Sequence, residues 1–149
     1  MKFIFLLSLI SGSLSMATES THDLADEVKY RAELYSIKLD GLSHLSKFKS
    51  SDLDEIVNRD LALCSQIGES YHYVFDLQIA GDNLVHAVAP TDQRFLDKII
   101  SGMGKKRLAM SGFCTGDSTG KYRDIASLRS LIDDSMSDFK ALASFLTKF

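Results

Sequence analysis

The feature that most constrains the fold of this chain is a seven-residue spacing of large apolar side chains near its C-terminal end. Ile125, Ile132, Phe139 and Leu146 follow one another at this interval. Residues seven apart share one face of a helix, because seven residues make nearly two turns. We therefore predict a helix over residues 125–149 whose apolar seam packs against other helices. The seam also contains Leu128, Leu131, Met136, Leu142, Phe145 and Phe149, and the residues expected to face away are Asp124, Arg129, Asp133, Asp134, Asp138 and Lys140.

Three other segments show helical spacing of their apolar residues. A first helix is predicted over residues 19–48, a second over 52–79 and a third over 91–103, with a short further helix over 108–113. The side chains expected to face the core are Leu24, Val28, Tyr35, Leu39, Leu42, Leu45 and Phe48 in the first helix, Leu53, Ile56, Val57, Cys64, Ile67, Tyr71, Val74 and Phe75 in the second, and Phe95, Leu96, Ile99, Ile100 and Met103 in the third.

Local signals suggest where these helices begin and end. Ser51 is the expected N-cap of the second helix, and Thr91-Asp92, after the single proline, can cap the third. The Ala-Gly-Asp-Asn stretch at 80–83 is expected to end the second helix, and Gly102 with Gly104 to weaken the end of the third. The glycine-rich residues 112–120 are expected to form a loop. Four helices with short connections predict an all-α protein, an antiparallel four-helix bundle.

Cys64 and Cys114 are the two cysteines of the chain. In an oxidising compartment an even pair favours a disulfide over two reduced thiols. A bridge that closes a loop of about 50 residues would stabilise the fold by roughly 4 kcal/mol in the chain-entropy treatment. It would tie the middle of the second helix to the loop before the fourth. The sequence has no CxxC or CxxCH motif, so we expect neither a thioredoxin-like redox site nor covalently bound c-type haem.

Residues 1–17 have the order of a secretory signal peptide. Lys2 precedes an apolar run that ends near Ile10, and a stretch rich in small residues follows up to Ala17. A membrane-spanning helix needs about 20 apolar residues, so a cleaved signal is favoured over a membrane anchor. We expect residues 18–149 to form a single helical domain that is periplasmic or extracellular, without stable membrane insertion. Loss of Lys2 with the signal changes the formal net charge from −3 to −4.

The stretch CTGDSTG at residues 114–120 resembles the nucleophile motif of chymotrypsin-like serine proteases. Thr119 stands where that family has glycine, and none of the four histidines neighbours a cysteine. The chain is also too short for the double β-barrel of that family, and its periodicity is helical. A capping loop for the fourth helix is favoured, with Ser118 or Thr119 as N-cap. The loop is not a phosphate-binding P-loop either, because only three residues separate Gly116 from Gly120.

Two short pairs of residues could contribute metal ligands. His22 and Asp26 are four apart on the first predicted helix, and Glu69 and His72 are three apart on the second. Two ligands make a weak site, and the di-iron site of a helical bundle needs further glutamates on facing helices in addition to Glu-x-x-His pairs. We therefore expect no metal and no cofactor.

Positive charge is concentrated in one part of the chain. Residues 94–129 hold eight basic and three acidic residues, a local balance of +5 in a chain whose formal net charge is −3. This segment is either a solvated loop region or an electrostatic docking face for an anionic partner. The candidate partner-binding residues are Lys105, Lys106, Arg107, Lys121 and Arg123. An acidic chain without interleaved exposed aromatic residues is a poor nucleic-acid binder, so an acidic protein surface or an anionic glycan is favoured.

The expected function is that of an exported, non-catalytic binding protein that docks another exported protein. In size, compartment and composition the chain is similar to the small single-disulfide helical immunity proteins of the bacterial periplasm, which inhibit delivered cell-wall hydrolases, although no shared motif supports membership. The alternative is a carrier of a lipid or a heme-like molecule in the bundle interior, near Tyr71, Tyr73 and Phe75. An enzyme is the least favoured class, because no convergent set of polar residues is evident.

Overall fold

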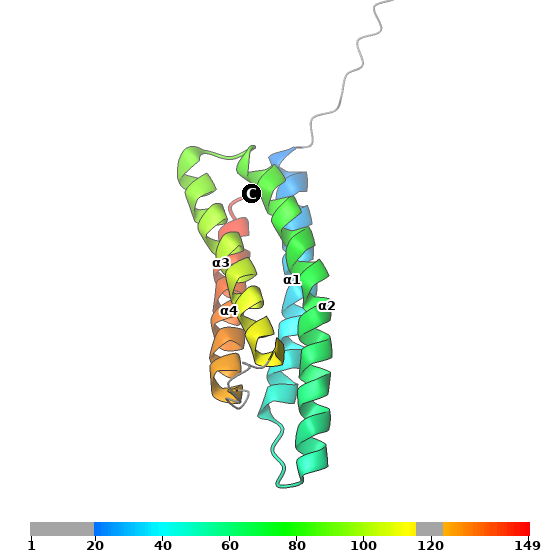
Figure 1. Ribbon diagram of the computed structural model, residues 1–149. Helices are drawn as coiled ribbons and strands as arrows, with labels where there is room; N and C mark the ends of the chain where they lie inside the picture. The colour runs from blue at the N-terminus through cyan, green and yellow to red at the C-terminus, as the bar shows by residue number, and fades with distance from the viewer. Residues whose placement is uncertain (1–19, 116–123) are drawn as a thin grey trace, which may run out of the picture.

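The structure, a computed structural model, describes residues 20–115 and 124–149, and within them the chain forms four helices and no strand. The helices are α1 (Thr21–Lys47), α2 (Leu53–Val85), α3 (Pro90–Thr115) and α4 (Ile125–Leu146). Consecutive helices run antiparallel, and each packs against two neighbours, so that α1 and α3 both contact α2 and α4 (Figure 1). The predicted antiparallel four-helix bundle is therefore confirmed.

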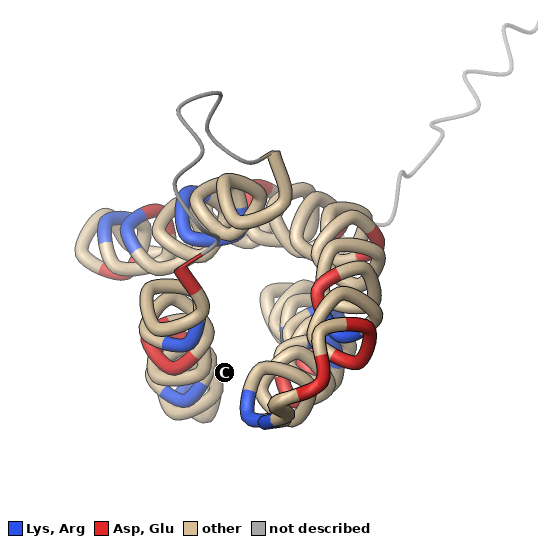
Figure 2. Tube along the Cα trace, turned by 60° about the horizontal axis from the view of Figure 1, so that its bottom comes forward, with Lys and Arg blue, Asp and Glu red and all other residues tan. Residues whose placement is uncertain are grey.

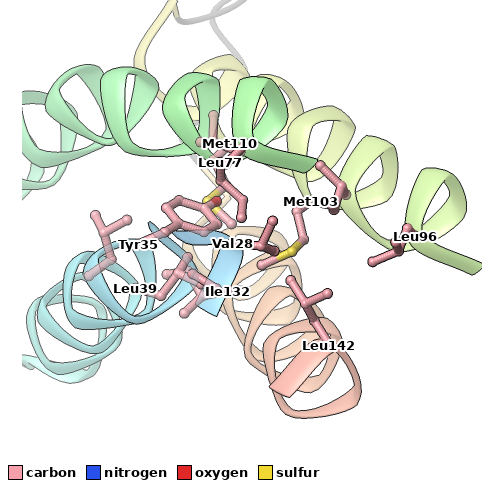
Figure 3. Packing of buried hydrophobic residues seen from close by; sticks show 14 of the residues in the cluster. Val28, Tyr35, Leu39, Leu77, Leu96, Met103, Met110, Ile132 and Leu142 are labelled. Carbon is pink, nitrogen blue, oxygen red and sulfur yellow. The ribbon is translucent and has the colours of Figure 1, made fainter. Parts of the chain in front are cut away.

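The core lies along the axis of the bundle and receives side chains from every helix. Tyr35 and Leu39 of α1, Leu77 of α2, Met103 of α3 and Ile132 of α4 point into the same interior space (Figure 3). Each of these five residues is almost completely buried. Viewed toward one end, the four helices surround this core and carry charged residues of both signs (Figure 2). Among the described helices, none combines the length and hydropathy that a membrane crossing requires.

The first predicted helix agrees with α1 to within two residues at each end. Ser20 caps it, since its side chain accepts a hydrogen bond from the Asp23 backbone while the Asp23 carboxylate accepts from the Ser20 backbone. Val28 is buried as expected, but Phe48 is 47% exposed, so its assignment to the core was wrong. Phe48 is the C-cap of α1 and has an extended backbone conformation. Helical periodicity therefore does not predict the direction of its side chain.

Helix α4 also follows the predicted periodicity. Its N-cap is Asp124, whose carboxylate accepts from the Ala126 and Ser127 backbone, so the expectation that Ser118 or Thr119 caps it was wrong. Ser118 and Thr119 themselves lie outside the described residues. Two residues expected to face solvent are half-buried instead, because each bonds a neighbouring helix. The Arg129 guanidinium donates to the Ser46 carbonyl of α1, and the Asp138 carboxylate accepts from Lys106 of α3.

Helix α2 is longer than predicted. Asp52, and not Ser51, is its N-cap, because the Asp52 carboxylate accepts from the backbone of Asp54 and Glu55. The helix then continues through residues 80–83 to Val85, so the expected stop at this stretch was wrong. Gly81 does not break the helix. It is buried, and a Cβ atom at this position would collide with the Ile100 side chain of α3.

Helix α3 is likewise continuous where a break was expected. It begins at Pro90 and passes through Gly102 and Gly104 to Thr115, so the separate helix at 108–113 and the start of the loop at 112 belong to one element. A Cβ on Gly104 would lie 2.5 Å from the Gln78 side-chain nitrogen of α2. Glycines 81 and 104 thus let α2 and α3 approach closely, whereas the sequence pattern at these positions is typical of helix ends.

The Cys64–Cys114 disulfide is present, with 5.4 Å between the two Cα atoms. Because α3 extends to Thr115, Cys114 lies in the last turn of that helix and not in the loop before α4 as expected. The bridge therefore joins two packed helices, α2 and α3, at the end of their contact.

Candidate docking surface

The lysine and arginine residues predicted to bind a partner differ in their surroundings. Lys105 is exposed, whereas Lys106 is half-buried between α3 and α4. The Lys106 ammonium donates to the Asp138 carboxylate at 2.6 Å and to the Asp134 carbonyl at 3.3 Å. Lys121 and Arg123, the other two lysine and arginine candidates after α3, lie outside the described residues.

Arg107 is directed toward α2. Its guanidinium donates to the Ile67 carbonyl at 2.9 Å and lies over the Tyr71 ring, 5.1 Å from the ring centroid. A charge-assisted hydrogen bond and a cation–π contact both favour this arrangement. Lys106 and Arg107 therefore hold α3 against α4 and α2, and Lys105 is the member of the described cluster that is free to meet a partner.

Three exposed cations form a row on α3, which we call the cationic row: Arg94, Lys98 and Lys105. They are four and seven residues apart, so helical geometry places them on one side of α3. None of them forms an ion pair with a described residue. Their charge is thus available at the surface of the bundle.

A second row of exposed side chains lies on α2, and it is apolar. Tyr71, Phe75 and Ile79, which we call the outer stripe, are four residues apart and 48%, 46% and 49% exposed. The Tyr71 and Phe75 rings stack with their centroids 5.8 Å apart. Arg107 lies over Tyr71, so the stripe is ordered by contacts from both α2 and α3.

The apolar surface continues toward the N-terminal end of α2. Leu53, Val57 and Leu61 are again four apart and are between 48% and 73% exposed. Leu53 precedes Tyr71 by 18 residues, which is five turns of an α-helix, so both sets lie on the same side of α2. The prediction that Leu53, Val57, Tyr71 and Phe75 face the core was therefore wrong. The buried residues of α2 are Leu63, Ile67, Ser70, Val74, Leu77, Ala80, Gly81 and Leu84.

A groove of about 770 Å³ is lined by two residues of the outer stripe and two residues of the cationic row. Phe75 and Ile79 line it from α2, and Arg94 and Lys98 line it from α3. Asp82 and Asp97 also line the groove, so the four charged side chains in it are balanced in number. The groove thus joins an apolar side and a positively charged side.

The two pairs considered as metal ligands are not assembled into a larger site, and residues 116–120 of the CTGDSTG motif lie outside the described residues. The His22 imidazole and the Asp26 carboxylate lie 3.4 Å apart, but both side chains are mostly exposed. Glu69 pairs with Lys38 of α1 at 3.1 Å and not with His72. No group of three His, Cys, Asp or Glu side chains that could hold a metal ion occurs among the described residues.

Tyr35 carries the most deeply buried titratable group for which a shift is evident. Burial in the core raises the pKa of its hydroxyl above the ordinary value, and the nearby Arg107 and Ser135 lower it by less. The hydroxyl has no hydrogen-bond partner among the described groups. A single phenol in the core does not provide a nucleophile, base or metal ligand set.

The outer stripe was not predicted from the sequence because its residues were merged with those of the buried face. Val74 and Phe75 are adjacent in sequence, yet the first is 3% and the second 46% exposed. The repeat of Leu53-Val57-Leu61 as Tyr71-Phe75-Ile79, five turns apart, is the signal that could have separated the two faces. The premise that aromatic residues are not exposed near the basic residues is also corrected by Tyr71 and Phe75.

No protein-family model matches this chain, and no curated protein or solved structure is significantly similar to it. Its function is therefore inferred from the surface itself.

Proposed function

We propose that this protein is an exported, non-catalytic binding protein that docks another exported protein through the surface formed by α2 and α3. The observation that carries the proposal is the outer stripe, Tyr71, Phe75 and Ile79, exposed beside the cationic row. Aromatic residues and arginine are enriched at protein interfaces, and contiguous exposed apolar surface marks interaction sites. An inhibitor or immunity protein is one form that such a docking protein takes.

Export is supported by the signal-like sequence of residues 1–17 and by the disulfide. Disulfides persist in oxidising compartments and are rare in the cytosol. The N-terminal residue of the protein recovered from the exported fraction tests this part of the proposal. A mature chain that begins between residues 16 and 18 supports export, and an intact Met1 argues against it.

An acidic protein surface is the favoured partner. Arg94, Lys98 and Lys105 offer three free cations next to the apolar stripe. Asp82 and Asp97 in the same groove, together with a formal net charge of −3, disfavour a nucleic acid, whose phosphates need a continuous basic surface. The carrier alternative loses its suggested ligand-contacting residues, because Tyr71 and Phe75 face outward and Tyr73 lies under Lys38.

Affinity capture from the exported fraction of the producing organism tests the docking surface. The bait is the mature protein, compared with Phe75→Ser/Ile79→Ser and with the matched control Leu53→Ser/Leu61→Ser. Both double variants replace two exposed apolar residues of α2, so both are expected to remain folded. We expect one stoichiometric partner with the wild type and the control, and its loss with Phe75→Ser/Ile79→Ser.

The proposal fails if the stripe variant retains the partner, or if no bait captures a partner. Substitution of Lys106 and Arg107 by glutamate is a poor test, because it would break their bonds to Asp138 and to the Ile67 carbonyl and so weaken the bundle itself. Arg94→Glu/Lys98→Glu avoids this problem, since neither side chain holds two of the described helices together.

A further inference from the structure

The two sides of the α2–α3 groove differ in chemistry. The α2 side presents the outer stripe, and the α3 side presents the cationic row. Asp97 lies seven residues before Gly104, whose backbone faces Gln78 of α2, so Asp97 lies on the α2 side of α3. The Asp97 carboxylate is therefore near the line where the two helices meet.

The apolar side has the spacing of a helix-binding ridge. Tyr71, Phe75 and Ile79 follow the i, i+4, i+8 row of α2, which is the ridge that packs into the groove of another helix. Such a row spans about 12 Å, or about two turns of an opposing helix. The described part of the chain has no strand and no sheet edge, so an extended peptide would find no backbone partners along this groove.

The cationic side extends along the same line. Arg94 and Lys98 line the groove, and Lys105 continues the row by two turns. Three unpaired cations beside an apolar ridge favour a partner with carboxylates on one flank only. The carboxylates of Asp82 and Asp97, which also line the groove, would accept hydrogen bonds from hydroxyl or amide donors between the two flanks.

We propose that the α2–α3 groove binds an amphipathic helix of the partner protein whose apolar face packs on Tyr71, Phe75 and Ile79 and whose acidic flank faces Arg94, Lys98 and Lys105. This inference rests on the proposed function and adds the chemistry of the element that is recognised. A nucleic acid, a basic helix and a second copy of this chain are the competing occupants.

Selection from a displayed library of random-faced helical peptides tests the inference without requiring the partner protein itself. The mature disulfide-bonded protein is the target. We expect enrichment of peptides with apolar residues at i, i+4 and i+7 and with Asp or Glu on one adjacent flank. Binding of the selected peptides should fall at least about 100-fold in Phe75→Ser/Ile79→Ser, as for loss of central interface residues. It should be unchanged in the control Leu53→Ser/Leu61→Ser.

Charge reversal tests the flank. Arg94→Glu/Lys98→Glu should weaken an enriched acidic peptide at least about tenfold, and a peptide with lysine in place of its acidic residues should regain that affinity on the variant. A control peptide with its acids moved to the opposite flank should bind the wild type weakly. Circular dichroism and thermal unfolding establish that each variant retains the wild-type fold.

The outcomes distinguish this inference from the proposed function. Enriched peptides without an acidic flank, or insensitive to Arg94→Glu/Lys98→Glu, overturn the inference even if the outer stripe still captures an exported partner. Self-association of the purified protein that is abolished by Phe75→Ser/Ile79→Ser also overturns it, since the groove would then hold a second copy. Absence of any captured exported partner overturns the proposed function itself.

Discussion

Helices α2 and α4 are both amphipathic and both pack against two neighbours, but they differ in how many apolar faces they carry. Among the described residues α4 exposes no large apolar side chain, whereas six of the ten large apolar residues that are exposed lie on α2. The large apolar residues of α4 all belong to the core or pack against it. Those of α2 form a buried face and an exposed face, so a count of its apolar residues overstates what α2 contributes to stability.

In α2 the buried face stabilises the fold, and the exposed face is available for recognition. Leu77 of α2 is fully buried, as are Leu128 and Ile132 of α4 to within 1%. Phe75, two residues away from Leu77, is 46% exposed and does not belong to the buried core. Exposed aromatic side chains cost a monomer solubility without adding to its core. Their presence on α2 and absence from α4 is the reason to place the docking surface on α2.

The largest expected effect concerns the covalent tie between α2 and α3. Replacement of both cysteines, Cys64→Ala/Cys114→Ala, should lower the free energy of unfolding by about 4 kcal/mol, because the bridge closes a loop of about 50 residues. Urea unfolding followed by circular dichroism measures the change. Reductant should destabilise the wild type by a similar amount and leave the double variant unaffected. An unchanged midpoint in the variant would mean that packing alone positions α2 beside α3.

The next effect compares the two faces of α2 directly. Leu77→Ala should cost about 3 kcal/mol of unfolding free energy, the usual loss for a buried leucine with the cavity that it leaves. Phe75→Ala removes a larger side chain, yet it should cost under about 0.5 kcal/mol because it is a surface substitution. Urea unfolding of the two variants checks this order. Equal losses would show that Phe75 belongs to the core, and the docking surface would then have no basis.

The contrast between α2 and α4 also explains which parts of the structure were predictable from the sequence. The four-helix class and the course of α1 and α4 follow from periodicity, because in these two helices one apolar face dominates. The disulfide follows from the even pair of cysteines. In α2 the same periodicity fits two faces, and residues such as Val57 and Phe75 were assigned to the wrong one. Single-sequence spacing measures which residues share a side, but not which side meets another helix.

The glycines show a second limit of sequence reasoning. Glycine in a helical segment is typical of a helix end, yet Gly81 and Gly104 lie at the contact between α2 and α3. Only the packing of these two helices distinguishes the two roles. The candidate docking surface was also only partly predictable, because it too depends on how the helices pack. Lys105 was chosen as a partner-binding residue. Arg94 and Lys98 were counted in the basic segment 94–129 but not chosen, because their freedom depends on which cations the neighbouring helices engage.

A smaller change in stability is expected to distinguish Gly81, which contacts α3, from the exposed Gly68. Gly81→Leu should destabilise the protein by about 1–3 kcal/mol, because the new side chain competes with Ile100 for space. Gly68→Leu introduces the same residue where no atom lies within 4 Å of the Cβ position, and should stabilise by up to about 1 kcal/mol through helix propensity. Thermal unfolding of both variants provides the test. A stable Gly81→Leu would mean that α2 and α3 do not need this close approach.

The smallest expected effect lies at the start of α4 and depends on pH. Hydrogen bonds from the Ser127 side chain and backbone, and from the Ala126 backbone, lower the pKa of the Asp124 carboxyl below its ordinary value. A folded-state pKa below the unfolded value means that the ionised cap stabilises the protein above about pH 4, the unfolded value, and that this contribution is lost as pH falls through the folded pKa. Asp124→Asn keeps an acceptor at the N-cap but cannot titrate. The difference in urea midpoint between wild type and Asp124→Asn should therefore shrink from pH 7 to pH 3, and a difference that stays constant over this range would contradict the role of the ionised cap in starting α4.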